Sequence, residues 1–325
     1  MANKYNNLSE LFTATANAIR SKTGSTDPIV ADDFPEAIEA ISSGGGSTEE
    51  WFNDGNTHLW ITLPEGRTSP MLGVGVKGTV TVDWGDGTEP DVLTGTSEWT
   101  TLYTSNHNYK RAGEYVITLS GNCSIGLSGS SNGAYILAAS ASVNDKVNYT
   151  YRNAVRKIEV GNNMTGLSTR AFHGLSSLSN VYTHNGITYL PDYAFAQCRS
   201  LTSIVLSDHI TRLNASVFSG CGALTSVVLP ANISTIPISS FYDCYSLASV
   251  AIPDKVTSIN STAFLNCYSL SYVDFSNHTD VPTLGDTSAF TNIPSDCAIR
   301  VPAALVDEWK AATNWSTYAD YIVGV

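Results

Sequence analysis

Apolar residues in the second half of the chain recur every 23 positions. Five phenylalanines keep this step and a sixth follows after 26 residues, while four cysteines keep the step three residues after a phenylalanine. A leucine column keeps it too, and Val155 extends the register one unit upstream. Six units can therefore be counted. The columns are Phe172, Phe195, Phe218, Phe241, Phe264 and Phe290; Cys198, Cys221, Cys244 and Cys267; and Leu178, Leu201, Leu224, Leu247 and Leu270.

Each unit combines a short β segment with a second, more widely spaced apolar set. In the unit that begins at Leu201, Ile204 and Leu206 occupy alternating inward positions, and Phe218 and Cys221 belong to the second set. A unit of this size cannot bury these side chains alone, whereas stacked copies bury them against one another. The pattern predicts a solenoid of parallel strands that begin near Val155 and near each leucine of the column.

The pattern L-x-x-[IV]-x-[LI], together with the recurring A-F-x-x-C, resembles the leucine-rich repeats of the BspA type, which are named for bacterial surface proteins. The resemblance implies a solenoid over residues 152–300. The cysteine position holds Leu175 in the first unit and Ile293 in the last, which also has a three-residue insertion. Residues 301–325 are similar to the terminal cap of that family, and apolar residues at helical spacing predict a helix there. These are Leu305, Val306, Trp309 and Ala312.

The N-terminal part of the chain has a different character. Residues 1–41 have the apolar spacing of two short helices, with Ser9 and Asp33 as N-caps. The stretch LFTATANAIRSKTGSTDPIVADDFPEAIEAI resembles the N-terminal segments of tail and baseplate-associated proteins of phages and prophages of Gram-positive bacteria. That resemblance implies an attachment segment that binds other virion tail or baseplate proteins. Residues 42–56, which include SSGGGST, form a predicted linker.

Strand patterns dominate residues 57–121. The segments VDWGDGT at 82–88 and HNYKRAGEYVITL at 107–119 resemble the β-sandwich of the polycystic-kidney-disease (PKD) type. Residues 122–151 are either an insertion or the N-terminal cap of the solenoid. The predicted fold class is therefore mostly β, with a short helical N-terminal segment, a PKD-like sandwich, a BspA-type solenoid with a 23-residue period and a helical C-terminal cap.

The composition argues against several classes of function. The 325 residues include 17 Lys and Arg against 29 Asp and Glu, a net charge of −12, and only 14% of residues are charged. So few cations argue against nucleic-acid binding. No apolar run of about 18 residues occurs, so no membrane insertion is expected. The N-terminus lacks the pattern of a secretory signal, which fits assembly in the bacterial cytoplasm as a virion component.

Two clusters could carry chemistry, and each has a simpler interpretation. The cysteine column could bind metal, but no His lies at ligand spacing, and a buried ladder of small apolar groups fits better. The carboxylates of the sandwich could hold Ca²⁺, although they do not have the spacing of an EF-hand and turn formation explains them as well. This calcium candidate consists of Asp83, Asp86, Glu89 and Asp91.

A candidate ligand surface lies on the outward strand positions. Two columns alternate with the inward residues and contain hardly any charge, so they predict either a contact surface or simply good strand-forming residues. Tyrosines clustered just after the cysteine column are a second candidate, for a sugar or a protein, against ordinary loop packing. The first column is Asn180, Ser203, Ser226, Ser249 and Tyr272; the second is Tyr182, Val205, Val228, Ala251 and Asp274; the tyrosine cluster is Tyr242, Tyr245 and Tyr268.

No phosphate-binding loop, nucleophile elbow or zinc-protease motif occurs. The sequence therefore predicts a non-enzymatic protein without a cofactor: a phage or prophage tail-fibre or tail-tip protein whose solenoid binds a host surface protein or glycan. A bacterial cell-surface or secreted adhesin of the BspA type is the alternative. A glycan-active enzyme is a third hypothesis, because paired carboxylates leave no spacing signature. The sequence leaves homo-oligomerisation open.

Overall fold

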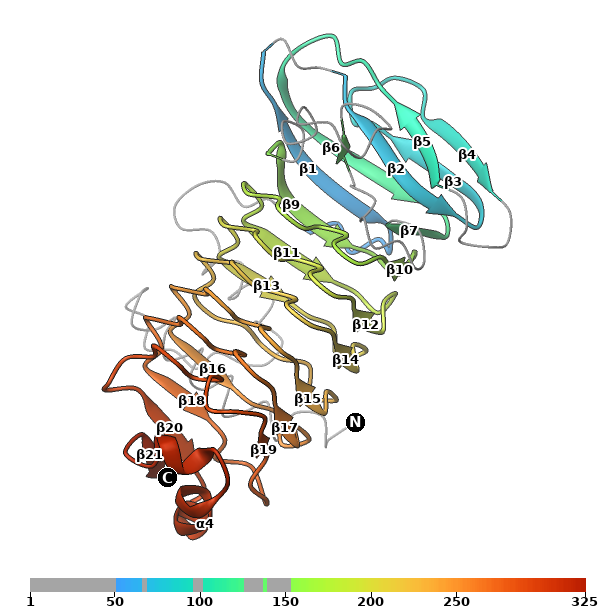
Figure 1. The fold of residues 1–325 in the computed structure, drawn as a ribbon. Helices are drawn as coiled ribbons and strands as arrows, with labels where there is room; N and C mark the ends of the chain where they lie inside the picture. Colours follow the sequence, from blue (N-terminus) through green and yellow to red (C-terminus); the bar gives the residue numbers. More distant parts are fainter. Residues whose placement is uncertain (1–50, 66–68, 96–101, 126–136, 139–152) are drawn as a thin grey trace, which may run out of the picture. The chain divides into compact units, whose positions relative to one another are not determined.

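The computed structural model describes residues 51–65, 69–95, 102–125, 137–138 and 153–325. The predicted attachment segment and most of the linker, through residue 50, lie outside the described residues. Most of the predicted insertion or cap at 122–151 lies outside them too. Residues 52–325 make up one compact unit, and it is built mostly from short β-strands (Figure 1).

The N-terminal strands of this unit belong to two sheets that share one apolar core. In the first, β3 pairs antiparallel with β4 and β6, and β6 pairs with β1; in the second, β2 pairs with β5, β7 and β8. Val80 and Val82 are buried between exposed neighbours, as the alternating sequence requires. The strands are β1 (Thr57–Leu63), β2 (Met71–Val76), β3 (Gly78–Asp83), β4 (Asp91–Gly95), β5 (Leu102–Asn106), β6 (Gly113–Ser120), β7 (Cys123–Ile125) and β8 (Leu137–Ala138).

The solenoid follows with the predicted 23-residue period over about seven turns. In its first row of strands, β11 pairs in parallel with β9 and β13, and β18 pairs with β16 and β20. The strand predicted near Leu224 is a single bridge between Val205 and Val228. The row continues past the six predicted strands, because β20 and β21 pair in parallel as well. The row consists of β9 (Val155–Val160), β11 (Asn180–Thr183), β13 (Ser203–Val205), β16 (Ser249–Ala251), β18 (Tyr272–Asp274), β20 (Ala298–Val301) and β21 (Ile322–Gly324).

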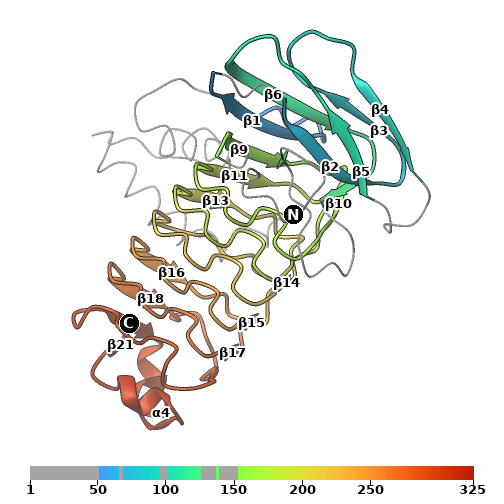
Figure 2. The same cartoon turned by 45° about the horizontal axis from the view of Figure 1, so that its top comes forward.

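A second row of short strands and a helical cap complete the solenoid (Figure 2). The cap contains one α-helix, and its Trp309 is fully buried with its ring 4.8 Å from that of Phe275. The predicted helix at the C-terminal end is therefore confirmed. The second row consists of β10 (Met164–Leu167), β12 (Tyr189–Leu190), β14 (Arg212–Leu213), β15 (Thr235–Ile236), β17 (Ser258–Ile259) and β19 (Thr283–Leu284); the cap consists of η4 (Ala303–Leu305), α4 (Val306–Ala311) and η5 (Trp315–Tyr318).

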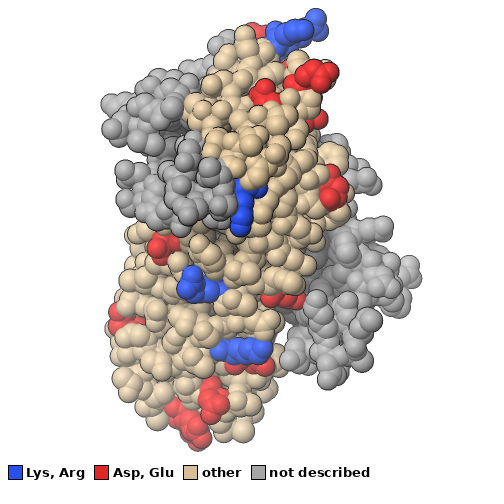
Figure 3. Space-filling model, turned by 90° about the vertical axis from the view of Figure 1, so that its right-hand side faces the viewer, with Lys and Arg blue, Asp and Glu red and all other residues tan. Residues whose placement is uncertain are grey.

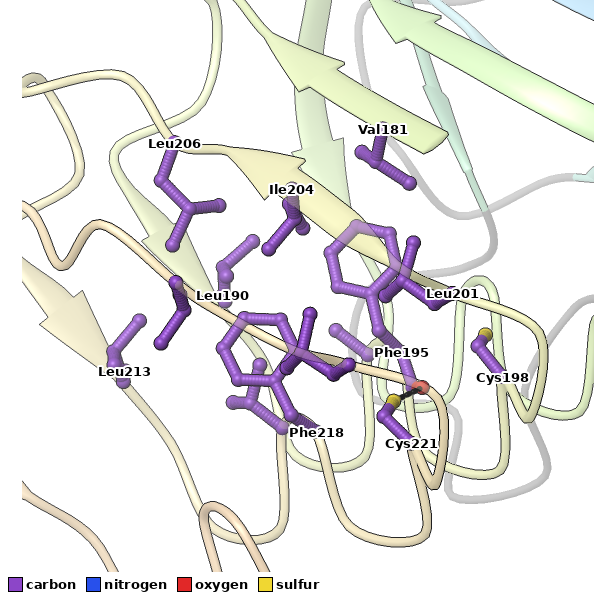
Figure 4. Close-up of a cluster of buried hydrophobic side chains, with 14 of the residues drawn as sticks. Val181, Leu190, Phe195, Cys198, Leu201, Ile204, Leu206, Leu213, Phe218 and Cys221 are labelled. Carbon is purple, nitrogen blue, oxygen red and sulfur yellow. Dashed lines mark hydrogen bonds between the residues drawn. The ribbon is translucent and has the colours of Figure 1, made fainter. Parts of the chain in front are cut away.

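The phenylalanine column is the centre of the solenoid core. Each ring stacks on the ring of the next coil, with centroids 5.1–6.0 Å apart. Figure 4 shows Phe195 and Phe218 in neighbouring coils, surrounded by leucine and isoleucine side chains of the same coils. Every ring of the column is 0–1% exposed. The 23-residue spacing therefore corresponds to one turn of the solenoid.

The two-sheet part and the solenoid are joined by one continuous sheet. Strand β1 pairs antiparallel with β6 on one side and with β9 on the other, so the sheet runs β13-β11-β9-β1-β6-β3-β4. In the second sheet, β7 pairs in parallel with β10 of the first coil. Strands β1 and β7 thus cover the first coil, which would otherwise expose unpaired backbone groups.

Candidate functional site

Each coil turns sharply just after its phenylalanine. The residue before the cysteine position has φ between 59° and 75° in six successive coils. This left-handed conformation is easiest for Gly and is tolerated by Asn and Asp, which accounts for five of the six residues found there; Gln197 is the exception. We call this set the left-handed column. It consists of Gly174, Gln197, Gly220, Asp243, Asn266 and Asn292.

The next residue of the turn is the cysteine, and its side chain points into the core. Each thiol of the column donates a hydrogen bond to the phenylalanine carbonyl of the preceding coil, with Sγ to oxygen distances of 3.1–3.3 Å. The bond from Cys221 to Phe195 is drawn in Figure 4. Leu175 and Ile293 fill the same position with apolar carbon and are buried as well. The position therefore selects a small apolar group, and the thiol adds a weak hydrogen bond.

We expect the column thiols to be unreactive in the folded protein. Burial raises the pKa of Cys198 and of Cys267 to about 12, and it raises the pKa of Cys221 and Cys244 well above the ordinary value. Little nucleophilic thiolate then exists near neutral pH. Titration with a chromogenic disulfide reagent without denaturant measures the number of reactive thiols in the native protein. The same titration in denaturant gives the total number of thiols. Fast labelling of more than two of the six cysteines in the native protein would contradict it.

The two predicted outward columns occupy neighbouring positions on successive strands. Tyr182 lies beside Val205, and Val205 lies beside Val228. In the later coils, Ala251 lies beside Asp274. The side chains are half-buried except for Ser226 and Val228, which are exposed, Val228 at 41%. The two columns thus form a face of mostly uncharged side chains, in which Asp274 is the one carboxylate; we call it the strand face.

Charge is sparse on the surface that Figure 3 shows, where isolated Lys, Arg, Asp and Glu side chains stand among uncharged residues. Some of the few cations are turned onto aromatic rings of the neighbouring coil. The Arg300 guanidinium lies 3.9 Å from the ring centroid of Tyr272, and that of Arg212 lies 4.9 Å from Tyr189. Such contacts tie neighbouring coils together at the surface.

Two of the three predicted tyrosines form a stacked pair. The Tyr245 and Tyr268 rings are 5.6 Å apart and 10° from parallel, and they are 45% and 55% exposed. Tyr242 is half-buried on the same turn as Tyr245. One coil upstream the corresponding position is Gly222, where an ideal Cβ would stand 3.3 Å from the Tyr245 ring. The stack therefore begins at Tyr245, because the preceding coil has no side chain at this position.

A polar ladder runs beside this stack, on the left-handed column. The Asn266 side-chain amide donates to the Asp243 carboxylate at 2.7 Å, and that of Asn292 donates to the Asn266 amide oxygen at 2.8 Å. Partial burial and the Asp243 carboxylate raise the pKa of Tyr245 above its ordinary value. The aromatic stack and the polar ladder are therefore in contact at Asp243. Together, Asp243, Tyr245, Asn266, Tyr268 and Asn292 form what we call the tyrosine–amide ridge.

Three of the four carboxylates proposed for Ca²⁺ accept hydrogen bonds from nearby groups. Asp83 accepts from the Gly85 backbone, and Asp86 accepts from Thr88 and contacts His107 at 2.9 Å. Asp91 accepts from the Trp84 indole at 2.8 Å and from Ser105. In the described part of the chain, no group of three or more His, Cys, Asp or Glu side chains is placed to hold a metal ion. The contacts of Asp83 and Asp86 are those of local turns, as in the simpler interpretation, whereas Asp91 joins Trp84 to Ser105.

The side-chain network at the junction of β1 and β9 was not anticipated from the sequence. Glu159 is fully buried and accepts hydrogen bonds from the Phe52 and Asn53 backbone at 3.0 Å and from His184 at 2.7 Å. Burial alone would raise the pKa of Glu159, but these hydrogen bonds, with that from His184 first, lower it. The left-handed column was also missed, although recurring Gly and Asn before the cysteine position signal it.

Comparison with protein families identifies the repeats. Residues 144–271 match the model of the BspA type leucine rich repeat region in six copies. The chain contains a BspA-type leucine-rich repeat region. The matched coils carry most of the strand face and of the tyrosine–amide ridge, and Tyr272, Asp274 and Asn292 lie beyond residue 271. No curated protein matches the chain. None of the helices in the described residues has the length and apolar character needed to cross a bilayer.

Several solved structures are similar to the chain. A leucine rich cell surface protein of Faecalibacterium prausnitzii is 21% identical, with a TM-score of 0.36, and the match covers 52% of each chain. The pneumococcal vaccine antigen PcpA is 17% identical, with a TM-score of 0.43 over 59% of this chain and 44% of PcpA. The T. pallidum leucine rich repeat protein is 22% identical, with a TM-score of 0.32 over 44% and 73% of the two chains. The chain thus spans about half the length of the first of these relatives.

Proposed function

We propose that this chain is a non-enzymatic recognition protein of a phage or prophage tail, of the tail-fibre or tail-tip type. In this proposal the BspA-type region contacts the host cell, and residues 1–41 bind other tail or baseplate proteins. The two-sheet part acts as a PKD-like spacer between them. The observation that carries the proposal is the strand face, because its largely uncharged side chains repeat from coil to coil in a fixed register.

The strand face suits contact with a large partner for a physical reason. Its backbone is held by hydrogen bonds between coils and by the stacked phenylalanines, so little side-chain or backbone order must be created on binding. Val228 is apolar and open, and its neighbour Val205 is half-buried. A partner that covered them would gain apolar burial without having to strip water from a charged group.

A bacterial cell-surface or secreted adhesin is the second candidate. The match to the BspA-type region favours it, since that repeat type is named for surface proteins. Both candidates use the same recognition surface and differ in what the N-terminal segment joins. Immunogold labelling of induced phage particles separates them: label on tails supports the virion protein, and label confined to the cell envelope supports the adhesin.

Lysine substitutions on the strand face test the contact. We expect Val205→Lys with Val228→Lys to abolish adsorption of the fluorescently labelled protein to susceptible cells, because two cations would be desolvated at the interface. The matched control is Thr211→Lys with Ser234→Lys, which puts the same charge on exposed positions of the same two coils, outside the strand face. The control variant should adsorb like the wild type, and both variants should melt at about the wild-type temperature.

A truncated chain tests the division of roles. We expect a fragment that begins at Trp51 to adsorb to cells and to fail to join particles, because it keeps the compact unit and lacks residues 1–41. Flow cytometry measures adsorption, and particle purification measures incorporation. If a 1–41 fragment bound cells while the Trp51 fragment did not, the assigned roles would be reversed.

A further inference from the structure

We propose that the tyrosine–amide ridge binds a neutral glycan chain. The inference rests on the proposed recognition function and names the ligand class of the BspA-type region. The ridge lies just before strands β16 and β18, so it borders the strand face. It is an open ridge, which a polymer can follow without entering a pocket.

The aromatic part of the ridge is placed for contact rather than for packing. Tyr245 and Tyr268 are about half exposed, whereas the phenylalanine four residues before each of them is fully buried. The two rings hold each other parallel, so binding needs little further ordering of their side chains. The C–H groups of a pyranose carry partial positive charge and pack against the electron-rich face of such rings.

The polar part of the ridge offers the groups that hydroxyls need. Within the described residues, the ladder uses one of the two amide N–H groups of Asn266 and one of those of Asn292. Each amide thus retains a second donor, and the Asp243 carboxylate has more lone pairs than its bond from Asn266 occupies. A planar carboxylate or amide can bond two adjacent hydroxyls at once. Ser246 and Ser269, each following a ridge tyrosine, add hydroxyls of their own.

The repeat itself indicates a polymer. The same groups recur one coil apart, at a strand spacing of about 4.8 Å. A chain of sugar units presents its hydroxyls and C–H faces repeatedly along one axis, whereas a folded protein surface does not. The ridge contains no Lys or Arg, and its one carboxylate is already hydrogen-bonded to Asn266. An acidic polymer would therefore meet no cation, so a neutral chain is favoured.

Cell-binding measurements on the full-length protein separate a glycan from a protein ligand. Susceptible cells are treated either with periodate, which cleaves vicinal diols, or with a broad protease, and adsorption of labelled protein is measured. We expect periodate to reduce adsorption at least about tenfold and protease to leave it within about twofold. Loss after protease with retention after periodate would identify a protein partner and overturn the proposal.

Substitutions in the ridge test whether it is the part of the protein that binds the cells. We expect Tyr245→Ala with Tyr268→Ala to weaken adsorption to untreated cells at least about tenfold, since two aromatic contacts are lost. The double Phe variant keeps both rings and should bind more tightly than the Ala variant. The control is Tyr193→Ala, which removes an exposed tyrosine outside the ridge and should bind like the wild type. Wild-type adsorption by the double Ala variant, with its melting temperature unchanged, would overturn the proposal.

A second measurement keeps this inference separate from the proposed function. Saturation-transfer NMR uses chitotetraose, cellotetraose, maltotetraose and mannotetraose at millimolar concentration with the full-length protein. We expect transfer to at least one sugar in the wild type, and its loss in the double Ala variant. If the protein adsorbs to no cell and yet shows this transfer, the proposed function fails and the glycan site stands. Absence of transfer to all four sugars would reject the glycan site, whatever the cells show.

Discussion

Replacement of Phe218 by Ala is expected to lower the free energy of unfolding by about 3 to 5 kcal/mol. The Phe218 ring is fully buried, and its centroid lies 6.0 Å from that of Phe195 and 5.4 Å from that of Phe241. Truncation removes its apolar burial and leaves a cavity that two stacked rings cannot easily fill. Urea denaturation followed by circular dichroism measures the loss.

Two controls test this interpretation. Phe218→Leu leaves a smaller cavity and should cost less than the Ala variant. Tyr268→Ala removes a ring that is 55% exposed and should change stability by only a few tenths of a kcal/mol. Because each coil contacts only its neighbours, the transition of Phe218→Ala should also broaden as one end of the solenoid loosens first. An unchanged melt of Phe218→Ala would rule out the buried ladder.

The second large effect is expected at Glu159. Glu159→Ala should destabilise the protein by about 3 to 5 kcal/mol, because it leaves the backbone amides of Phe52 and Asn53 and the His184 ring without their shared buried acceptor. Glu159→Gln keeps one acceptor oxygen and should cost less. Differential scanning calorimetry at pH 7 measures both. Equal melting temperatures for the Ala variant and the wild type would refute the role of this carboxylate.

Acidification should remove the contribution of Glu159. Its pKa in the folded protein lies below the ordinary value of 4.5, so the unfolded chain binds the proton more tightly. The stabilisation is therefore fully present above about pH 4.5 and is lost as the pH falls through the folded-state pKa. The stability difference between the wild type and Glu159→Gln should shrink over that range. A difference that stayed constant down to pH 3 would contradict the lowered pKa.

The sequence alone determined the architecture of the solenoid. The phenylalanine and cysteine columns recur at one spacing, and only stacked coils bury all of them, so period and core follow from the same residues. The neighbours on the strand face, such as Tyr182 and Val205, follow from the same register. The helix of the cap follows from local apolar spacing. All of these features depend on contacts one coil apart or closer.

Strands β20 and β21 escaped the sequence analysis because the 23-residue period breaks. Strand β20 belongs to a seventh strand position of the first row, and Ala298 pairs with Tyr272 26 residues earlier. Residues 301–325, predicted as a cap, contain both the helix and strand β21, which continues the row. Without a leucine or a cysteine at the expected step, nothing in the local pattern distinguishes a coil from its cap.

Only the tertiary structure decided how the two parts of the unit join. Strand β1 pairs with β9 across about 100 residues of chain, and no periodicity links the two segments. Glu159 and His184 meet because that pairing and the next coil bring them together, although each is unremarkable in sequence. The tyrosine–amide ridge could be predicted only in part. Its tyrosines recur in the sequence, but its amide ladder depends on the left-handed turn. Local spacing does not reveal the direction of the side chains on that turn.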